Sequence, residues 1–232
     1  MIDMRQSANP NGSTCKRLVV LISGGGSNLQ TFIDLCASGD LNANVVAVIS
    51  NNPNAGGLDR AAKKNIPNVI IDHRNFDNRE TFDRALSEII DSFAPDLIIL
   101  AGFMRILTTE FVNHYSGQLI NIHPSLLPAY PGLHTHRRAI DAGDKEAGAT
   151  VHFVTSELDG GPSIIQAKVP IEKNDNEQTL AAKVLQFEHK IFPQAVRWFC
   201  EGKLCMKEGI ALLDNCPIPE NGMIFNSETN NN

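Results

Sequence analysis

The feature that most constrains the fold is a glycine loop between a short apolar run and an amphipathic one. Residues 17–22 (RLVVLI) have the β-branched character of a buried strand, residues 23–28 (SGGGSN) follow at once, and from Leu29 apolar residues recur at helical spacing. A strand, a tight glycine turn and a helix in this order are typical of α/β domains. The opening of the chain therefore predicts a sheet with a binding loop after its first strand.

The same alternation continues along the chain. Further strands are predicted by apolar runs at 45–50, 68–71, 96–101 and 118–122. Helical patterns separate most of them, at 58–64, 79–93 and 110–115. After about residue 148, two extended runs, 149–155 and 164–170, are joined by a glycine-containing turn, which is typical of a hairpin. We expect a Rossmann-like, doubly wound, mostly parallel α/β sheet with a C-terminal antiparallel hairpin-like addition.

A long helix is predicted after the hairpin. Asp175 and Gln178 have the spacing of a capping box, and an apolar face follows as far as Trp198. Pro193 falls inside this pattern, so a kink or an interruption is expected there.

The composition is that of one ordinary globular domain. Hydrophobic residues make up 42% and charged residues 20% of the 232 residues, which excludes a disordered or fibrous chain. The net charge of -6 disfavours a nucleic-acid partner, because phosphate backbones require a basic face. No apolar run approaches the roughly 20 residues that span a bilayer. We expect no membrane partner, and a monomer or homodimer.

The two ends of the chain differ in amino-acid composition from the middle. Residues 1–16 are largely polar and lack the apolar core of a secretory signal, so a flexible tail and a cytoplasmic location are expected, with a trimmed organellar leader as the alternative. A single domain is expected over 17–213. Residues 214–232 lose apolar periodicity and end in an all-polar run, which predicts a second flexible tail.

Cysteine and histidine spacings indicate no metal site. The five cysteines include no C-x-x-C pair, and the histidines show neither H-E-x-x-H nor a facial triad. We expect reduced thiols and no metal.

The glycine loop has the chemistry of a phosphate cradle. Gly26 and its two glycine neighbours allow close backbone approach, and the amides of Ser27 and Asn28 open a helix whose dipole favours anions. G-x-G-x-x-G and the P-loop lysine are missing, which disfavours dinucleotides and triphosphates. A plain strand-to-helix turn fits the loop alone equally well.

Asn121 and His123 are candidates for acyl-transfer chemistry. They stand two apart at the end of the last predicted parallel strand, so both side chains point to the same side. A carboxamide can stabilise an oxyanion, and histidine transfers protons near neutrality. Asp159, in a turn, could stabilise a protonated His123, or could bond only its own backbone. Glu188, beside an apolar helix face, requires either a buried basic partner or a substrate amine.

Four motifs follow one another along the chain: VLISGGGSNLQ (20–30), LAGFMRIL (100–107), NIHPSLLP continuing through YPGLHTH (121–136), and VHFV with LDGGP (151–162). In this order, over about 17–213, they resemble the glycinamide ribonucleotide transformylases within the wider group of formyl-folate formyltransferases and hydrolases. One departure is Gly25, where many relatives carry a polar residue.

The resemblance implies direct formyl transfer from 10-formyltetrahydrofolate to the amine of glycinamide ribonucleotide in purine synthesis, with no covalent enzyme species. It implies the catalytic residues Asn121, His123 and Asp159. For the ribonucleotide it implies Gly26, Ser27 and Asn28 at the phosphate and Glu188 at the glycinamide end. For the folate it implies Arg79, Met104, Arg105, Ile106, Leu107 and Asn121.

Other functions fit less well. A formyltetrahydrofolate hydrolase is the nearest alternative, but it normally carries an additional N-terminal regulatory domain. A methionyl-tRNA formyltransferase needs a further C-terminal RNA-binding domain. A dehydrogenase or a non-catalytic nucleotide-binding module has no reason to carry N-I-H-P together with Asp159.

Overall fold

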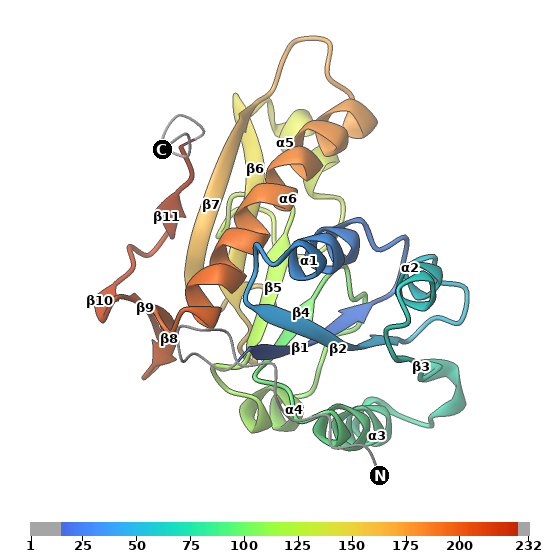
Figure 1. Cartoon of the computed structure of the whole chain (residues 1–232). Coiled ribbons are helices and arrows are strands. Elements are labelled where there is room, and N and C mark those ends of the chain that lie inside the picture. The colour runs from blue at the N-terminus through green and yellow to red at the C-terminus, as the bar shows by residue number, and fades with distance from the viewer. Residues whose placement is uncertain (1–14, 227–232) are drawn as a thin grey trace.

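The core of the protein is a twisted sheet, seen here in a computed structural model that describes residues 15–226 (Figure 1). Its parallel strands are β1 (Lys16–Ile22), β2 (Ala43–Ser50), β3 (Asn68–Ile70), β4 (Leu97–Leu100) and β5 (Leu119–His123). The hairpin strands β6 (Glu146–Phe153) and β7 (Ser163–Pro170) add to it antiparallel, and the short β11 (Met223–Ile224) runs parallel to β7. The spatial order is β11-β7-β6-β5-β4-β1-β2-β3. The expected mostly parallel sheet and its antiparallel addition are confirmed.

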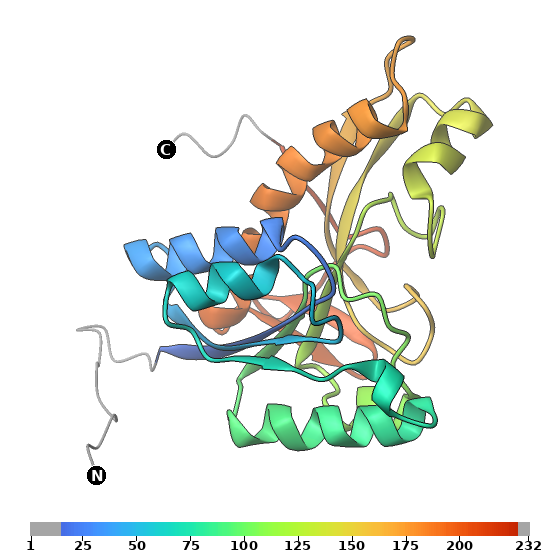
Figure 2. The ribbon, with the colours of Figure 1, turned by 90° about the vertical axis from the view of Figure 1, so that its right-hand side faces the viewer.

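Helices cover both faces of this sheet. One face carries α1 (Ser27–Ser38), α2 (Gly57–Lys63), α5 (Thr135–Ala142) and α6 (Glu177–Cys200), and the other carries α3 (Arg79–Ser92) and α4 (Thr109–His114) (Figure 2). A 3-10 turn, η1 (His73–Asn75), precedes α3. In β1, Leu18 and Val20 face the first layer, whereas Val19 and Leu21 face the second. From Leu18 to Ile22 this strand is apolar, because both of its faces are buried there.

The strand order reverses between β1 and β4. From β1 the chain proceeds outward to β2 and β3, then returns to place β4 and β5 on the other side of β1. Parallel strands end at the same edge, so the loops after β1, β4 and β5 lie next to one another. Ligands of open α/β sheets bind at such an edge.

The start of α6 differs from the expected one, and Pro193 lies within an unbroken helix. Its N-cap is Asn176, whose side chain accepts from the backbone of Gln178 and Thr179, and Thr179 completes the capping box. Asp175 instead bonds Lys183. Pro193 does not interrupt the helix, because the packing of the buried segment around it outweighs one lost backbone hydrogen bond.

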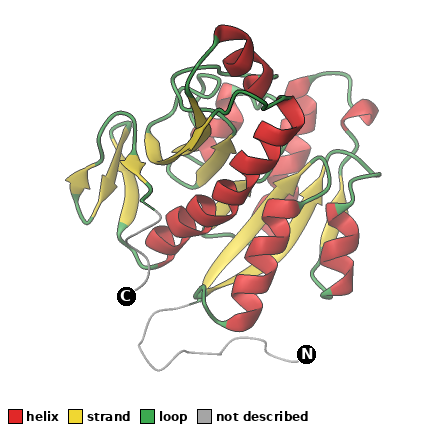
Figure 3. Ribbon diagram, turned by 90° about the horizontal axis from the view of Figure 1, so that it is seen from above, coloured by secondary structure: helices red, strands yellow, loops and turns green. Residues whose placement is uncertain are grey.

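The C-terminal region is more structured than the sequence predicts. A small antiparallel sheet of β8 (Leu204–Lys207), β9 (Ile210–Leu213) and β10 (Cys216–Pro217) stands beside the main sheet (Figure 3). Because β10 and β11 fall within 214–226, the expectation of a flexible tail is wrong there. The rest of that tail, 227–232, and residues 1–14 of the other lie outside the described residues. Within 15–226, no helix is both long and apolar enough to cross a membrane.

Candidate active site

The glycine loop joins β1 to α1. Gly26 is the N-cap of α1, with a φ of 71° and no side-chain hydrogen bond to the helix. A Cβ there would lie 2.8 Å from the Cα of Gly57, so loop and α2 approach too closely for a side chain. No acidic residue occupies the first turn of α1. The first backbone N–H groups of α1 have no acceptor within the helix, and together with the helix dipole they favour binding of an anion.

Ser23 connects this loop to the segment after β4. Its backbone N–H donates to the carbonyl of Gly102 over 3.1 Å, and its Oγ accepts from the N–H of Met104 over 2.7 Å. The expected phosphate loop and the start of the expected folate segment are therefore in direct contact.

Asn121, His123 and Asp159 come together around one turn. Asn121 and His123 lie on β5, and Asp159 lies in the turn between β6 and β7. His123 Nδ1 is 3.4 Å from Asp159 Oδ2, and both side chains are largely buried. The sequence leaves the position of Asp159 open; folding the β6–β7 hairpin against β5 brings it to His123.

Two further contacts fix this pair. The backbone N–H of Gly132 donates to Asp159 Oδ2 over 2.8 Å, and His123 Nε2 lies 2.9 Å from the carbonyl oxygen of Tyr130. Both ring nitrogens of His123 thus face acceptors, and only the doubly protonated ring can donate to both at once.

His152 joins the group, although the sequence did not single it out. It stands opposite Asn121 in the β5–β6 register, and its Nε2 is 3.1 Å from Asn121 Nδ2. Its Nδ1 faces the carbonyl of Phe153 at 2.8 Å and must donate, which leaves Nε2 to accept from Asn121. Burial lowers the pKa of His152 to about 4, so the ring is neutral near pH 7. Its 3.8 Å approach to Asp159 is then not an ion pair. The signal in the sequence is the alternation of polar Thr150 and His152 within an apolar strand.

A narrow cleft of about 100 Å³ lies beside the trio. Arg105, Ile106 and Leu107 line it together with Asn121 and Asp159. His123 does not line it, although its Nδ1 is 3.4 Å from Asp159, which does. Met104, which is 64% exposed, does not line it, and neither does Arg79, the first residue of α3. The structure therefore brings three of the expected folate contacts to Asn121 and Asp159, but neither Met104 nor Arg79.

Glu188 is 9% exposed on α6 and faces the first turn of α1. Its Oε2 accepts from Asn28 Nδ2 over 2.8 Å, and no ion pair within the described residues includes it. Burial raises the pKa of this carboxyl, which the hydrogen bond from Asn28 only partly offsets. A buried carboxylate without a cation beside the glycine loop suits an incoming amine.

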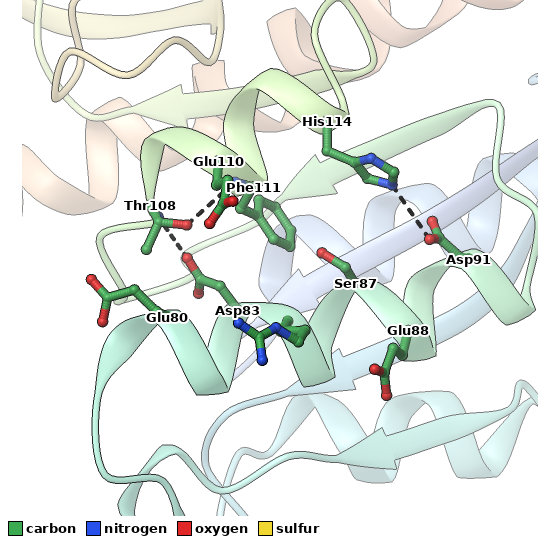
Figure 4. A pocket seen from close by; sticks show the side chains of 10 residues that line it. Glu80, Asp83, Ser87, Glu88, Asp91, Thr108, Glu110, Phe111 and His114 are labelled. Atoms are coloured by element: carbon green, nitrogen blue, oxygen red, sulfur yellow. Dashed lines mark hydrogen bonds and ion pairs between the residues drawn. The ribbon is translucent and has the colours of Figure 1, made fainter.

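A larger groove of about 320 Å³ lies elsewhere, between α3 and α4 (Figure 4). Five carboxylates line it, against a single arginine, Arg84. Such a surface repels phosphate and other anions, and none of the expected catalytic or ribonucleotide residues lines it. It is therefore not the candidate active site.

Comparisons with known proteins agree with this geometry. Residues 16–196 match the family model of the formyl transferases. Phosphoribosylglycinamide formyltransferase of Escherichia coli is 53% identical over 205 residues, which span 88% of this chain and 97% of that protein. The chain belongs to this formyl transferase family.

Two further proteins are similar to this chain. The solved phosphoribosylglycinamide formyltransferase of Coxiella burnetii superposes with a TM-score of 0.88 at 47% identity, covering 91% of this chain and 99% of that one. The human trifunctional purine biosynthetic protein adenosine-3 is 42% identical over 192 residues, which are 83% of this chain but 19% of that protein. The match to whole bacterial formyltransferases indicates an enzyme of this type that uses a folate co-substrate.

The cleft has the donors and apolar surface that a folate ring requires. Leu107 and Val112 provide apolar wall, and Arg105 and Asn121 provide polar groups. Among residues 15–226, no group of three or more His, Cys, Asp or Glu side chains is arranged to hold a metal ion.

Proposed function

We propose that this enzyme transfers the formyl group of 10-formyltetrahydrofolate to the primary amine of N1-(5-phospho-D-ribosyl)glycinamide, in purine biosynthesis and without a metal. The observation that carries the proposal is the convergence of Asn121 and Asp159 on the cleft lined by 105–107, at the sheet edge that also holds the glycine loop. The name shared by the E. coli and C. burnetii relatives supports the choice of acceptor.

The ribonucleotide would be held at two points. Its phosphate would lie on the glycine loop, against the amides of Gly26, Ser27 and Asn28, because that helix end has unfilled donors. Its glycinamide amine would face Glu188, which has no cationic partner among the described residues and is linked to the loop through Asn28. Asn28 and Glu188 would therefore set the distance between phosphate and amine.

In the reaction, the amine nitrogen attacks the formyl carbon and forms a tetrahedral intermediate. The bond from that carbon to N10 then breaks, N10 gains a proton, and the amine loses one, so that the products are the N-formyl ribonucleotide and tetrahydrofolate. Asn121, oriented by His152, would donate its second amide N–H to the oxyanion. The imidazolium of His123 would stabilise the same negative charge and help to move the proton, and Asp159 would hold it in the charged form.

The test is a spectroscopic assay of tetrahydrofolate release from 10-formyltetrahydrofolate, with and without the ribonucleotide. Release that requires the ribonucleotide supports the transferase. Equal release without it would indicate a formyltetrahydrofolate hydrolase, and no release in either case would contradict both functions. Activity that survives exhaustive chelation supports the absence of a metal.

Substitutions of the trio test the roles. His123→Ala and Asp159→Asn should lower kcat by about 10² to 10⁴, the range of general acid–base catalysis, and leave the Kd of the ribonucleotide nearly unchanged. A normal kcat with weakened ribonucleotide binding would contradict these roles.

A further inference from the structure

His123 and Asp159 both form hydrogen bonds with the backbone of one loop. The loop after β5 provides the carbonyl of Tyr130 to His123 and, two residues later, the N–H of Gly132 to Asp159. Their 3.4 Å separation is thus set by one stretch of backbone. Any contact that fixes the position of this loop therefore also fixes His123 relative to Asp159.

Two buried polar side chains hold the loop at its beginning. Thr150 on β6 is 0% exposed, and Gln166 on β7 is 3% exposed. They stand opposite each other in the β6–β7 register, and Gln166 Nε2 donates to Thr150 Oγ1 over 3.0 Å. Polar side chains this deeply buried are costly unless fully hydrogen-bonded.

Thr150 and Gln166 also form hydrogen bonds with the backbone of the loop after β5. Thr150 Oγ1 donates to the carbonyl of Ser125 over 2.7 Å and accepts from the N–H of Leu127 over 3.1 Å. Gln166 Nε2 donates to the carbonyl of Leu127 over 2.7 Å. Both backbone groups of Leu127 are therefore bound by side chains of the hairpin.

The held residues connect directly to the catalytic ones. The N–H of Ser125 donates to the carbonyl of His123 over 2.9 Å, and Ser125 Oγ donates to the carbonyl of Ala129, next to Tyr130, over 2.6 Å. Neither Thr150 nor Gln166 lines the cleft beside the trio. Thr150 also stands opposite His123 in the β5–β6 register, so the pair can act on the reaction only through the loop and through this strand pairing.

We propose that Thr150 and Gln166 are positioning residues, which lock the loop after β5 so that its backbone fixes His123 relative to Asp159. The inference rests on the proposed function, since it concerns the pair that the proposed reaction uses. A displacement on the order of 1 Å in such a pair can cost about 100-fold in rate.

Thr150→Val tests the proposal, because it keeps the shape and removes the hydroxyl that makes three of these bonds. The kcat should fall about 10- to 100-fold while KM for the ribonucleotide stays within about threefold, because the glycine loop is not touched. Thr150→Ser, which retains the hydroxyl, should restore kcat to within about threefold of the native enzyme. Should Thr150→Val fail to fold, Gln166→Met carries the same comparison, since it keeps the length of the side chain and removes the amide that makes both of its bonds.

Val169→Ala is the matched control. Val169 is buried on β7 three residues beyond Gln166, so it faces away from the loop, and its truncation destabilises the same hairpin without removing a polar contact. A readout independent of turnover is the NMR signal of the His123 ring, which should move in Thr150→Val and Gln166→Met but not in Val169→Ala.

The outcomes separate this inference from the proposed function. If the native enzyme lacks transferase activity, the proposed function fails, and the NMR signal alone decides the positioning role. If folded Thr150→Val or Gln166→Met shows the kcat and His123 signal of Val169→Ala, the pair is ordinary core and the inference is wrong.

Discussion

Asn28 Nδ2 donates to Glu188 Oε2 over 2.8 Å and so joins the first turn of α1 to the middle of α6 across 160 residues of sequence. The contact places a buried carboxylate next to the proposed phosphate site. Within residues 15–226, Glu188 has no cationic partner and Asn28 Oδ1 has no hydrogen-bond partner. An amine on the substrate could donate to the Glu188 carboxylate and to Asn28 Oδ1 alike.

Glu188→Gln should weaken ribonucleotide binding and stabilise the free enzyme. Removing a charge-assisted contact should raise KM for the ribonucleotide at least about tenfold, with KM for the folate unchanged. Burial raises the folded-state pKa of Glu188 above its unfolded value, so the native protein holds this proton more tightly, and stability is lost as pH rises through the folded pKa. At pH 7 the glutamine variant should therefore have the higher Tm in calorimetry. A lower Tm together with an unchanged KM would refute both parts.

His152 should make stability depend on pH below neutrality. Its pKa falls from an ordinary 6.5 to about 4, so between these values the unfolded chain binds a proton that the native protein does not. The stabilisation is complete above about pH 6.5 and is lost as pH falls towards 4, on the order of 3 kcal/mol in all. Urea titrations across this range measure it. His152→Gln should flatten this part of the profile, and an equally steep profile in the variant would show that another group is responsible.

Gly26→Ala should disrupt the glycine loop, whereas Gly25→Ala should be tolerated. At Gly26 the positive φ and the 2.8 Å approach to Gly57 both oppose a methyl group, so we expect a loss of about 1–3 kcal/mol in the free energy of unfolding and much weaker ribonucleotide binding. A Cβ at Gly25 meets no atom within 4 Å. Calorimetry and binding titrations on both variants test this. Equal effects would mean that the loop has no special requirement at Gly26.

Asp83→Ala should weaken folate binding. Asp83 is 3% exposed in α3, and its Oδ2 accepts from the N–H of Thr108 over 2.6 Å, directly after the proposed folate segment 104–107 (Figure 4). Loss of this charge-assisted bond, about 1.5–3 kcal/mol, should raise KM for the folate about tenfold or more and leave KM for the ribonucleotide unchanged. Glu80→Ala, on the exposed surface of the same helix, is the control. If both variants behave alike, Asp83 does not anchor the segment.

Much of the fold could be predicted because its signals are local. The apolar runs of β1 and β4 reflect strands buried on both faces, and the glycine loop has few alternatives to a tight turn before a helix. The missed elements lack such signals. The strands β8 to β11 are two to four residues long, and the pairing of β11 with β7 depends on a segment more than 50 residues away. Packing also explains why α6 continues through Pro193, since residues on both sides of this proline are buried.

By itself, the sequence determined which chemical groups are present and which of them share a strand or a turn. Alternation along β5 placed Asn121 and His123 on one side, and the helix after the glycine loop predicted an anion site. The tertiary structure alone decided that Asp159 meets His123, that Asn28 meets Glu188, and that neutral His152 orients Asn121. These contacts join residues 31 to 160 positions apart, and their distances depend on how the hairpin and α6 pack against the parallel sheet, which no local pattern encodes.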